Sequence, residues 1–351
     1  ARNSAVDLMA LGGRYDRNMG VFSHRTVSSL SCRRGELYAV AMKPAILIHG
    51  PTASGKTQLA IALAKRLDGE IVNADSMQVY KDLRVLTARP SADEEAEAPH
   101  HLFGHVDAGE RYSTGKWLEA ARETLADIER RGKVAIVTGG TGLYFLALVS
   151  GLSDIPPTPE EVRADVKALV KAEGATGVRK RLEAVDPDGA ARFGDGDRQR
   201  LARAYEVWLS TGKSITAFQG QRSRPILAER EWLGVALTPP RPRLYARIDR
   251  RFEGMLMQGA MREAEALVSR GLDPELPAMK AHGMPWFAAF LNGDMSAESA
   301  ADMAKRDTRR YAKRQFTWIA RQFPFWPRIP SPELDGRLRV ILALHKELDA
   351  S

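Results

Sequence analysis

Short apolar runs alternate with longer amphipathic segments in the first half of the chain. Runs at 45–49, 70–74 and 134–137 are apolar on both faces, and each predicts a buried strand. Helices are expected at 57–67 and from about Ser113 to Arg131, where apolar residues recur at helical spacing. This alternation favours an α/β fold, in which a parallel sheet is covered by helices on both faces. In such sheets ligands bind beyond the carboxyl ends of the strands.

The pattern changes after a Pro-containing stretch at 151–159, which indicates a domain boundary. From 160 to about 212 the sequence is helical and charged without a strand signal, and the apolar run 231–237 then predicts a return to the sheet. Two further helices are expected near 243–270 and 297–321. We therefore expect a core at 44–157 and 226–332, an all-helical insertion at 158–225, and a C-terminal tail of weak pattern at 333–351.

Composition adds an expectation about partners. Lys and Arg number 52 against 44 Asp and Glu, a net charge of +8 that favours an anionic partner. The single cysteine, Cys32, excludes an intrachain disulfide and a cysteine-based zinc site. No apolar run approaches the roughly 18 residues of a membrane span, so no membrane partner is expected.

Residues 1–43 differ from the rest, with seven basic residues against three acidic ones. We interpret them as a disordered extension, translated from sequence upstream of a start at Met42, in a bacterial cytoplasmic protein. An organellar transit peptide is the alternative.

A phosphate-binding loop follows the first predicted strand. The match to G-x-x-x-x-G-K-T lies between a strand and a helix, the context in which this motif binds phosphates. Backbone N–H groups and the helix N-terminus would attract phosphate oxygens, Lys56 would neutralise charge, and the Thr57 hydroxyl would hold Mg²⁺. An ordinary glycine-rich turn is the alternative. The motif recognises a diphosphate rather than ATP in particular, and it comprises Gly50, Pro51, Thr52, Ala53, Ser54, Gly55, Lys56 and Thr57.

Acidic residues are scarce at the strand ends. After the strand at 134–137 the chain reads Thr138 to Gly142, without the carboxylate that a nucleotide hydrolase would place there. Asp75 ends the second strand and is suited to accept a proton from a nucleophile held against the bound phosphates. Its alternative role is to cap a helix or turn.

Basic residues concentrate on the predicted helices. Arg243, Arg247 and Arg251 form a stripe at four-residue spacing. Within 305–321 the only acid is Asp307, and aromatic residues are interleaved, which favours an RNA-backbone surface over a solvated helix. The basic residues there are Lys305, Arg306, Arg309, Arg310, Lys313, Arg314 and Arg321. The only histidine cluster, at 100–105, fits no zinc spacing and is assigned structural roles.

Several motifs together resemble the tRNA dimethylallyltransferase family, also called tRNA isopentenyltransferase. Beside the phosphate loop, they are Asp75-Ser76-Met77-Gln78-Val79-Tyr80-Lys81, Thr87-Ala88-Arg89-Pro90, Gly139-Gly140-Thr141-Gly142-Leu143-Tyr144 and Lys313-Arg314-Gln315. The resemblance spans roughly residues 44 to 326. It implies a P-loop core like that of nucleotide kinases, and an insertion that grips the anticodon stem-loop of tRNA.

The activity implied by this resemblance is transfer of dimethylallyl from dimethylallyl diphosphate to N6 of the adenosine at tRNA position 37, just 3′ of the anticodon. The products would be N6-isopentenyladenosine and diphosphate, with Mg²⁺ as cofactor and a monomer as the active form. Eukaryotic members typically carry a C-terminal zinc finger, which needs cysteines that this chain lacks, so a bacterial-type member is expected.

The resemblance also implies roles for individual residues. Asp75 matches the general base, and Lys56, Thr141 and Arg251 would complete the catalytic set. Two departures stand out, because Leu86 replaces a usual Gly and Met284-Pro285 replaces a usual Tyr-basic pair. The positions matched to tRNA contacts are Asp75, Ser76, Met77, Gln78, Thr141, Arg163, Gln199, Arg200, Leu201, Ala202, Arg203, Lys280 and Gly283.

Three other functions fit parts of the sequence. An isopentenyltransferase acting on free AMP, ADP or ATP would share the loop and the base, but it would not need so long a basic surface. A small-molecule or nucleoside kinase would use the loop for ATP. A non-catalytic RNA-binding protein would not need Lys56, Thr57 and Asp75 intact.

Overall fold

The computed structural model describes residues 43–218, 220, 222–228 and 231–350, and the backbone of two short strands before them. These strands, β1 (Leu30–Arg33) and β2 (Glu36–Ala39), pair antiparallel. They belong to a separate unit, Ala1–Met42, from the unit Lys43–Ser351. The expectation of a disordered extension does not hold for these two strands, and otherwise it falls outside the described residues.

A six-stranded parallel sheet forms the centre of the larger unit. Its order is β5 (His100–His101), β4 (Gly69–Asn73), β6 (Val134–Gly139), β3 (Ala45–His49), β7 (Trp232–Leu237) and β8 (Arg328–Ile329). Strands β3, β4 and β6 are buried along their whole length, as expected for a parallel sheet with helices on both faces. The predicted α/β fold class is confirmed.

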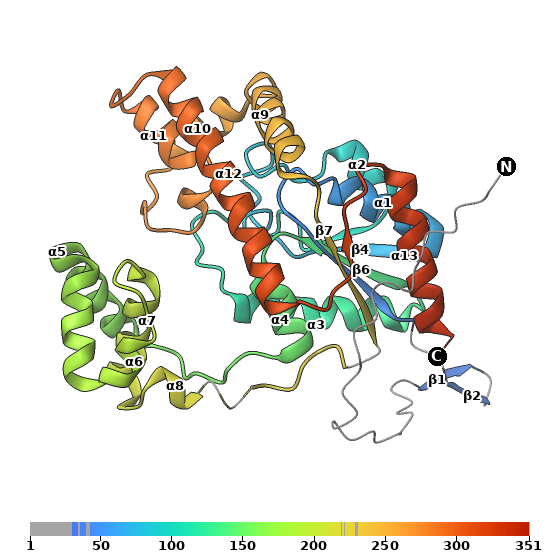
Figure 1. Cartoon of the computed structure of the whole chain (residues 1–351), viewed down its shortest axis with the longest axis horizontal. Coiled ribbons are helices and arrows are strands. Elements are labelled where there is room, and N and C mark those ends of the chain that lie inside the picture. Colours follow the sequence, from blue (N-terminus) through green and yellow to red (C-terminus); the bar gives the residue numbers. More distant parts are fainter. Residues whose placement is uncertain are drawn as a thin grey trace. The chain divides into compact units, whose positions relative to one another are not determined.

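The two faces of the sheet support separate apolar clusters, because side chains alternate along each strand. Ile46 and Ile48 of β3 pack beneath α1 (Lys56–Leu67) and α13 (Leu334–Asp349), which lie side by side (Figure 1). Leu47 packs on the opposite face with α3 (Thr114–Arg130) and α4 (Gly142–Ser150). The short helix α2 (Ala92–Glu97) contacts α1.

The segment expected to be a C-terminal tail at 333–351 is part of the core. Leu338 and Ile341 of α13 are buried in the same cluster as β3. The Pro-rich stretch before this helix obscured the helical spacing of its apolar positions. This expectation was therefore wrong.

The described residues of the insertion form helices, apart from an isolated antiparallel β-bridge between Arg222 and Ser153. The helices are α5 (Glu160–Val185), with a kink at Gly174, then α6 (Pro187–Ala191), α7 (Arg198–Thr211) and α8 (Ile215–Phe218). The insertion has its own apolar cluster, which includes Val178, Leu182 and Leu201. Lys167 forms an ion pair of 2.9 Å with Asp273 of the core.

After β7 the chain forms α9 (Arg241–Met257), α10 (Ala260–Ser269), the 3₁₀ helix Ala278–Lys280, α11 (Met284–Leu291) and α12 (Ala297–Gln322). One helix was expected across 243–270, but the helix is interrupted at Gly259, which adopts φ 102° and immediately precedes α10. The expected helix at 297–321 is confirmed as α12. Among the described residues, no helix combines the length and apolar character that a membrane crossing requires.

Candidate active site

The phosphate-binding loop joins β3 to α1 and is shaped by two residues with left-handed backbone. Ala53 has φ 61° and Gly55 has φ 87°, so the chain curls back at the start of the helix. The Lys56 amine donates hydrogen bonds to the carbonyl oxygens of Gly50 (2.8 Å) and Pro51 (2.9 Å). The loop is thereby closed around its lysine, with the N-terminus of α1 directed at the space that an anion would occupy.

Asp75 stands two residues beyond β4, at the carboxyl edge of the sheet. Its backbone N–H donates to the Asn73 side chain (2.8 Å), and its Oδ1 accepts the backbone N–H of Met77 (2.9 Å). One carboxylate oxygen therefore stabilises a local turn, which is the capping role considered from sequence. The second oxygen remains available to a ligand.

The turn after Asp75 is held by Thr141, which precedes the first residue of α4. The Thr141 hydroxyl accepts the backbone N–H of Ser76 (2.9 Å) and donates to the Ser76 hydroxyl (3.2 Å). Gln78 donates to the carbonyl oxygens of Thr87 and Ala88, at 3.0 and 2.9 Å. Ser76 and Gln78 thus have defined positions before any RNA is bound.

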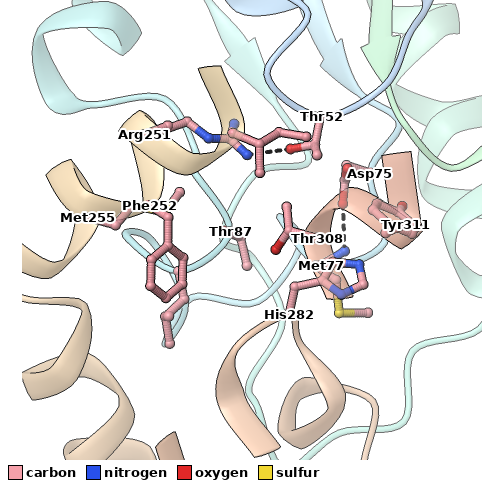
Figure 2. A pocket seen from close by; sticks show the side chains of 12 residues that line it. Thr52, Asp75, Met77, Thr87, Arg251, Phe252, Met255, His282, Thr308 and Tyr311 are labelled. Atoms are coloured by element: carbon pink, nitrogen blue, oxygen red, sulfur yellow. Dashed lines mark hydrogen bonds between the residues drawn. The ribbon is translucent and has the colours of Figure 1, made fainter. Parts of the chain in front are cut away.

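One pocket brings the loop, Asp75 and the C-terminal helices together. Figure 2 shows Thr52, Arg251 and Asp75 on one side of this pocket, with the Phe252 ring on another side. The Arg251 guanidinium donates to the Thr52 hydroxyl and so joins α9 to the phosphate loop. The pocket is lined by Thr52, Asp75, Met77, Leu86, Thr87, Ile248, Arg251, Phe252, Met255, His282, Thr308 and Tyr311.

Buried positive charge dominates the electrostatics of the site. Burial lowers the pKa of Lys56 to about 8; Asp75 opposes this shift and Arg251 adds to it. Burial also lowers the pKa of Arg251 to about 10, with Asp75 again opposing and Arg247 adding. The pKa of His49 falls to about 3 through burial and the nearby Lys56 charge. Lys56 and Arg251 are therefore cations in a poorly solvated site, where a bound anion would stabilise them, whereas the lowered pKa of His49 keeps that ring neutral.

Comparison with known proteins agrees with this geometry. A family model described as IPP transferase matches residues 78–322, and one described as isopentenyl transferase matches residues 43–101. A tRNA dimethylallyltransferase of Hyphomonas neptunium is 67% identical over 310 residues, which cover 88% of this chain and 98% of that protein. The chain belongs to the tRNA dimethylallyltransferase family.

Further members of the family support the assignment. A tRNA dimethylallyltransferase of Phenylobacterium zucineum is 52% identical over 86% of this chain and 98% of that protein. The crystal structure of a full-length tRNA isopentenylpyrophosphate transferase from Bacillus halodurans superposes with a TM-score of 0.63 at 32% identity, covering 88% of this chain and 98% of that one. A eukaryotic dimethylallyltransferase, described as acting on tRNA, gives a TM-score of 0.67 at 31% identity, over 79% and 70% of the two chains. The predicted family is confirmed.

No individual role was expected for three residues of α12 that lie at the site: Thr308 and Tyr311 line the pocket, and Gln315 contacts two of its loops. Gln315 is buried, accepts the backbone N–H of Thr52 (3.0 Å) and donates to the carbonyl oxygen of Gly140 (2.9 Å), so it bridges two loops of the site. Tyr311 lies one turn earlier on the same helix face, with its ring 4.2 Å from that of His282. The available signal was the spacing of Thr308, Tyr311 and Gln315, which share one face of a helix.

The residues matched to tRNA contacts in the insertion occupy different environments. Gln199 and Arg200 are exposed on α7, and Arg203 donates to the hydroxyl of Thr158. Leu201 is fully buried in the insertion core, so its side chain is not on the surface of α7. Ala202, beside it, is half-buried.

The remaining matched positions lie apart from the main pocket. Arg163 of α5 lines a second pocket with Arg111 and Lys116 of the core. Lys280 pairs with Glu275 at 2.7 Å, and Gly283 immediately precedes α11. Lys280 and Gly283 are close in sequence to His282, which lines the main pocket.

The basic surface of α12 is partly neutralised by α9, which the sequence did not reveal. Arg309 pairs with Asp249 at 2.6 Å, and Lys305 pairs with Glu253 at 3.0 Å. Within the described part of the chain, four exposed cations of α12 form no ion pair, and they are Arg306, Lys313, Arg314 and Arg321.

Metal ligands are sparse. The described residues contain no group of three or more His, Cys, Asp or Glu side chains that could hold an ion. The histidines of the 100–105 cluster have separate partners: His100 contacts the Ala98 carbonyl, His101 contacts Glu70 and His105 contacts Tyr112. A divalent cation at the phosphate loop would therefore depend on the Thr57 hydroxyl and the oxygens of its ligand.

Proposed function

We propose that this protein transfers the dimethylallyl group from dimethylallyl diphosphate to N6 of the adenosine at tRNA position 37, releasing diphosphate. The observation that carries the proposal is the shared pocket, in which Asp75 faces the same space as Thr52 of the phosphate loop and Arg251. A proton acceptor and a diphosphate-binding loop are the two groups that alkylation of an amine by an allylic diphosphate requires.

The order of bond changes follows from this arrangement. The adenine leaves the RNA stack and enters the pocket, because its N6 is otherwise out of reach of a buried site. N6 forms a bond to the allylic carbon as the bond from that carbon to the diphosphate oxygen breaks. The free oxygen of Asp75 accepts the N6 proton. Lys56, Arg251 and the loop N–H groups stabilise the charge that grows on the departing diphosphate.

Mg²⁺ fits this site as a companion of the diphosphate. Mg²⁺ in proteins is often held by one or two side chains together with substrate phosphates and water. The Thr57 hydroxyl, at the first turn of α1, has no hydrogen-bond partner among the described residues and would be its protein ligand. When bound, the ion would neutralise charge on the diphosphate oxygens.

The tRNA partner would lie across the insertion and α12. Gln199 and Arg200 present a polar, exposed face of α7, and Lys313 and Arg314 present unpaired positive charge on α12. Together they suit the phosphate backbone of an anticodon stem-loop. A monomer would suffice, since every group in this scheme belongs to one chain, and the bacterial cytoplasm would be its place of action.

The test is to incubate the protein with tRNA, dimethylallyl diphosphate and Mg²⁺, then digest the RNA and analyse its nucleosides by mass. The expected product is N6-isopentenyladenosine, located by fragment mapping at position 37. Parallel reactions replace tRNA by AMP, ADP or ATP. Prenylation of the free nucleotides without modification of tRNA would contradict the proposal in favour of a nucleotide isopentenyltransferase.

A second reaction separates the proposal from a kinase. The protein is incubated with γ-labelled ATP in the absence of tRNA, and label is followed to phosphate or to an added nucleoside acceptor. Little turnover is expected, because no carboxylate follows β6 at the position that a hydrolase uses. Rapid transfer of the label to any acceptor would favour the kinase.

A further inference from the structure

Arg337, near the start of α13, contacts the phosphate loop and is not among the residues that line the pocket. Its side chain is buried, with the residue 2% exposed. Nη1 donates to the backbone carbonyl of Ser54 (2.8 Å), and Nε donates to the carbonyl of Ser331 (2.6 Å). Its Nη2 is also buried and has no hydrogen-bond partner among the residues that the structure describes. Neither the family motifs nor the mechanism above assigns this residue a role.

We propose that Arg337 is a positioning residue for the donor: it fixes the Ser54–Gly55 peptide so that the loop is ready to bind a diphosphate. The carbonyl and the N–H of one trans peptide unit point in opposite directions. A hydrogen bond that holds the Ser54 carbonyl toward α13 therefore directs the Gly55 N–H away from α13, toward the interior of the loop. This is the direction from which loop N–H groups bind phosphate oxygens.

The conformation of Gly55 explains why the hydrogen bond from Arg337 matters for the orientation of the Ser54–Gly55 peptide. Gly55 adopts φ 87°, a region that glycine enters freely and leaves as freely. Without an external contact, the peptide before it would sample several orientations, and ordering it would oppose ligand binding. Arg337 supplies such a contact at close range, because a Cβ atom on Gly55 would lie only 2.9 Å from its Nη1.

Charge gives the guanidinium a second effect on the same ligand. Burial lowers the pKa of Arg337, and the neighbouring Arg247 lowers it further. No carboxylate forms an ion pair with Arg337 in the described part of the chain. A buried cation without an anionic partner destabilises the empty site, and a bound diphosphate brings compensating negative charge. Arg337 therefore favours the loaded loop over the empty one.

The inference rests on the proposed function for the identity of the donor, but the calorimetric part of its test does not. The variants are Arg337→Met, which removes the hydrogen bonds and the charge, and Arg337→Lys, which keeps the charge on a side chain that makes fewer directed contacts. Arg339→Met is the matched control, since Arg339 is exposed on the same helix. Inorganic diphosphate binding is measured by calorimetry with Mg²⁺, and KM for dimethylallyl diphosphate and for tRNA is measured separately.

Arg337→Met is expected to weaken diphosphate binding and to raise the donor KM by about tenfold or more, the usual effect of one charge-assisted hydrogen bond. The tRNA KM should stay within about twofold, Arg337→Lys should recover part of the loss, and Arg339→Met should match wild type. A lowered melting temperature with unchanged diphosphate affinity would overturn the inference, as would an equal loss for donor and tRNA.

If Arg337→Met does not fold, Arg337→Lys provides the test by itself. Wild-type diphosphate affinity in that variant would overturn the proposed positioning, and a loss of diphosphate affinity with an unchanged tRNA KM would support it. A wild-type protein that binds diphosphate through Arg337 but does not modify tRNA would leave this inference standing and contradict the proposed function.

Discussion

Asp75→Asn exchanges one carboxylate oxygen for an amide nitrogen and leaves the size of the side chain unchanged. The structure indicates which interactions survive. Oδ1 accepts the Met77 backbone N–H, and the amide oxygen of Asn can keep that bond. The amide nitrogen then takes the other position, which is the one open to a ligand, and it cannot accept a proton at neutral pH. The turn should persist while the base is lost.

The magnitude has two parts. Loss of a general base lowers the rate of the chemical step by about 10²–10⁴-fold. Loss of the negative charge of Asp75 favours diphosphate binding, because Asp75 partly offsets the positive charge of Lys56 and Arg251. While Lys56 stays protonated, diphosphate affinity should therefore be unchanged or slightly higher. The two effects together predict a variant that binds its donor well and transfers it slowly.

The assay is single-turnover transfer to tRNA with the enzyme in excess, at pH 6.5. Removing Asp75 lowers the pKa of Lys56 further below about 8, and the acidic pH keeps that lysine charged. Asp82→Asn is the control, since Asp82 also accepts a backbone N–H, from Ala108 at 3.0 Å, but lies outside the pocket. If Asp75→Asn lost tRNA binding yet transferred at the wild-type rate at saturation, Asp75 would be a positioning residue and the reasoning would fail.

Three other predictions follow from the site. Gln315→Ala leaves the Thr52 N–H and the Gly140 carbonyl without their buried partner, so we expect a loss of about 1–3 kcal/mol in the free energy of unfolding and weaker donor binding; unchanged thermal unfolding would count against the bridge. Diphosphate affinity should decline as pH rises through about 8, because Lys56 then loses its proton. Lys56→Ala should lose most of the diphosphate affinity, and the remaining pH dependence should be that of the diphosphate itself. If this variant kept the pH dependence of the wild type, Lys56 would not be the group that titrates. Replacing Lys313 and Arg314 by Ala should reduce the salt slope of tRNA binding by about one unit per lost phosphate contact, whereas an unchanged slope would support a merely solvated helix face.

Local features of the site could be predicted from the sequence because adjacent residues determine them. The phosphate loop depends on glycine and lysine at fixed spacing between a strand and a helix, and its geometry is set within eight residues. Asp75 follows an apolar strand directly, so its place at the carboxyl edge of the sheet follows from the parallel architecture. Four of the six strands were evident because a doubly covered sheet requires runs that are apolar on both faces, whereas β5 and β8, of two residues each, contain no such run.

The contacts that complete the site could not be predicted because they join distant parts of the chain. Gln315 reaches Thr52 across 263 positions, Arg251 reaches it across 199, and Arg337 reaches Ser54 across 283. Helical spacing tells which side chains share a face, but not which loop that face will cover. The direction of α12, α9 and α13 over the sheet is decided by the packing of their apolar positions.

Electrostatics was likewise settled by tertiary structure. The basic run of α12 looked uncompensated along the sequence, yet Asp249 and Glu253 of α9 neutralise part of it, because the two helices pack together. Burial lowers the pKa of Lys56 to about 8, an effect that no local pattern encodes. The sequence by itself determined which chemical groups this protein carries and on which elements; only the fold decided which of those groups are desolvated and brought together, since both depend on packing between elements far apart in the chain.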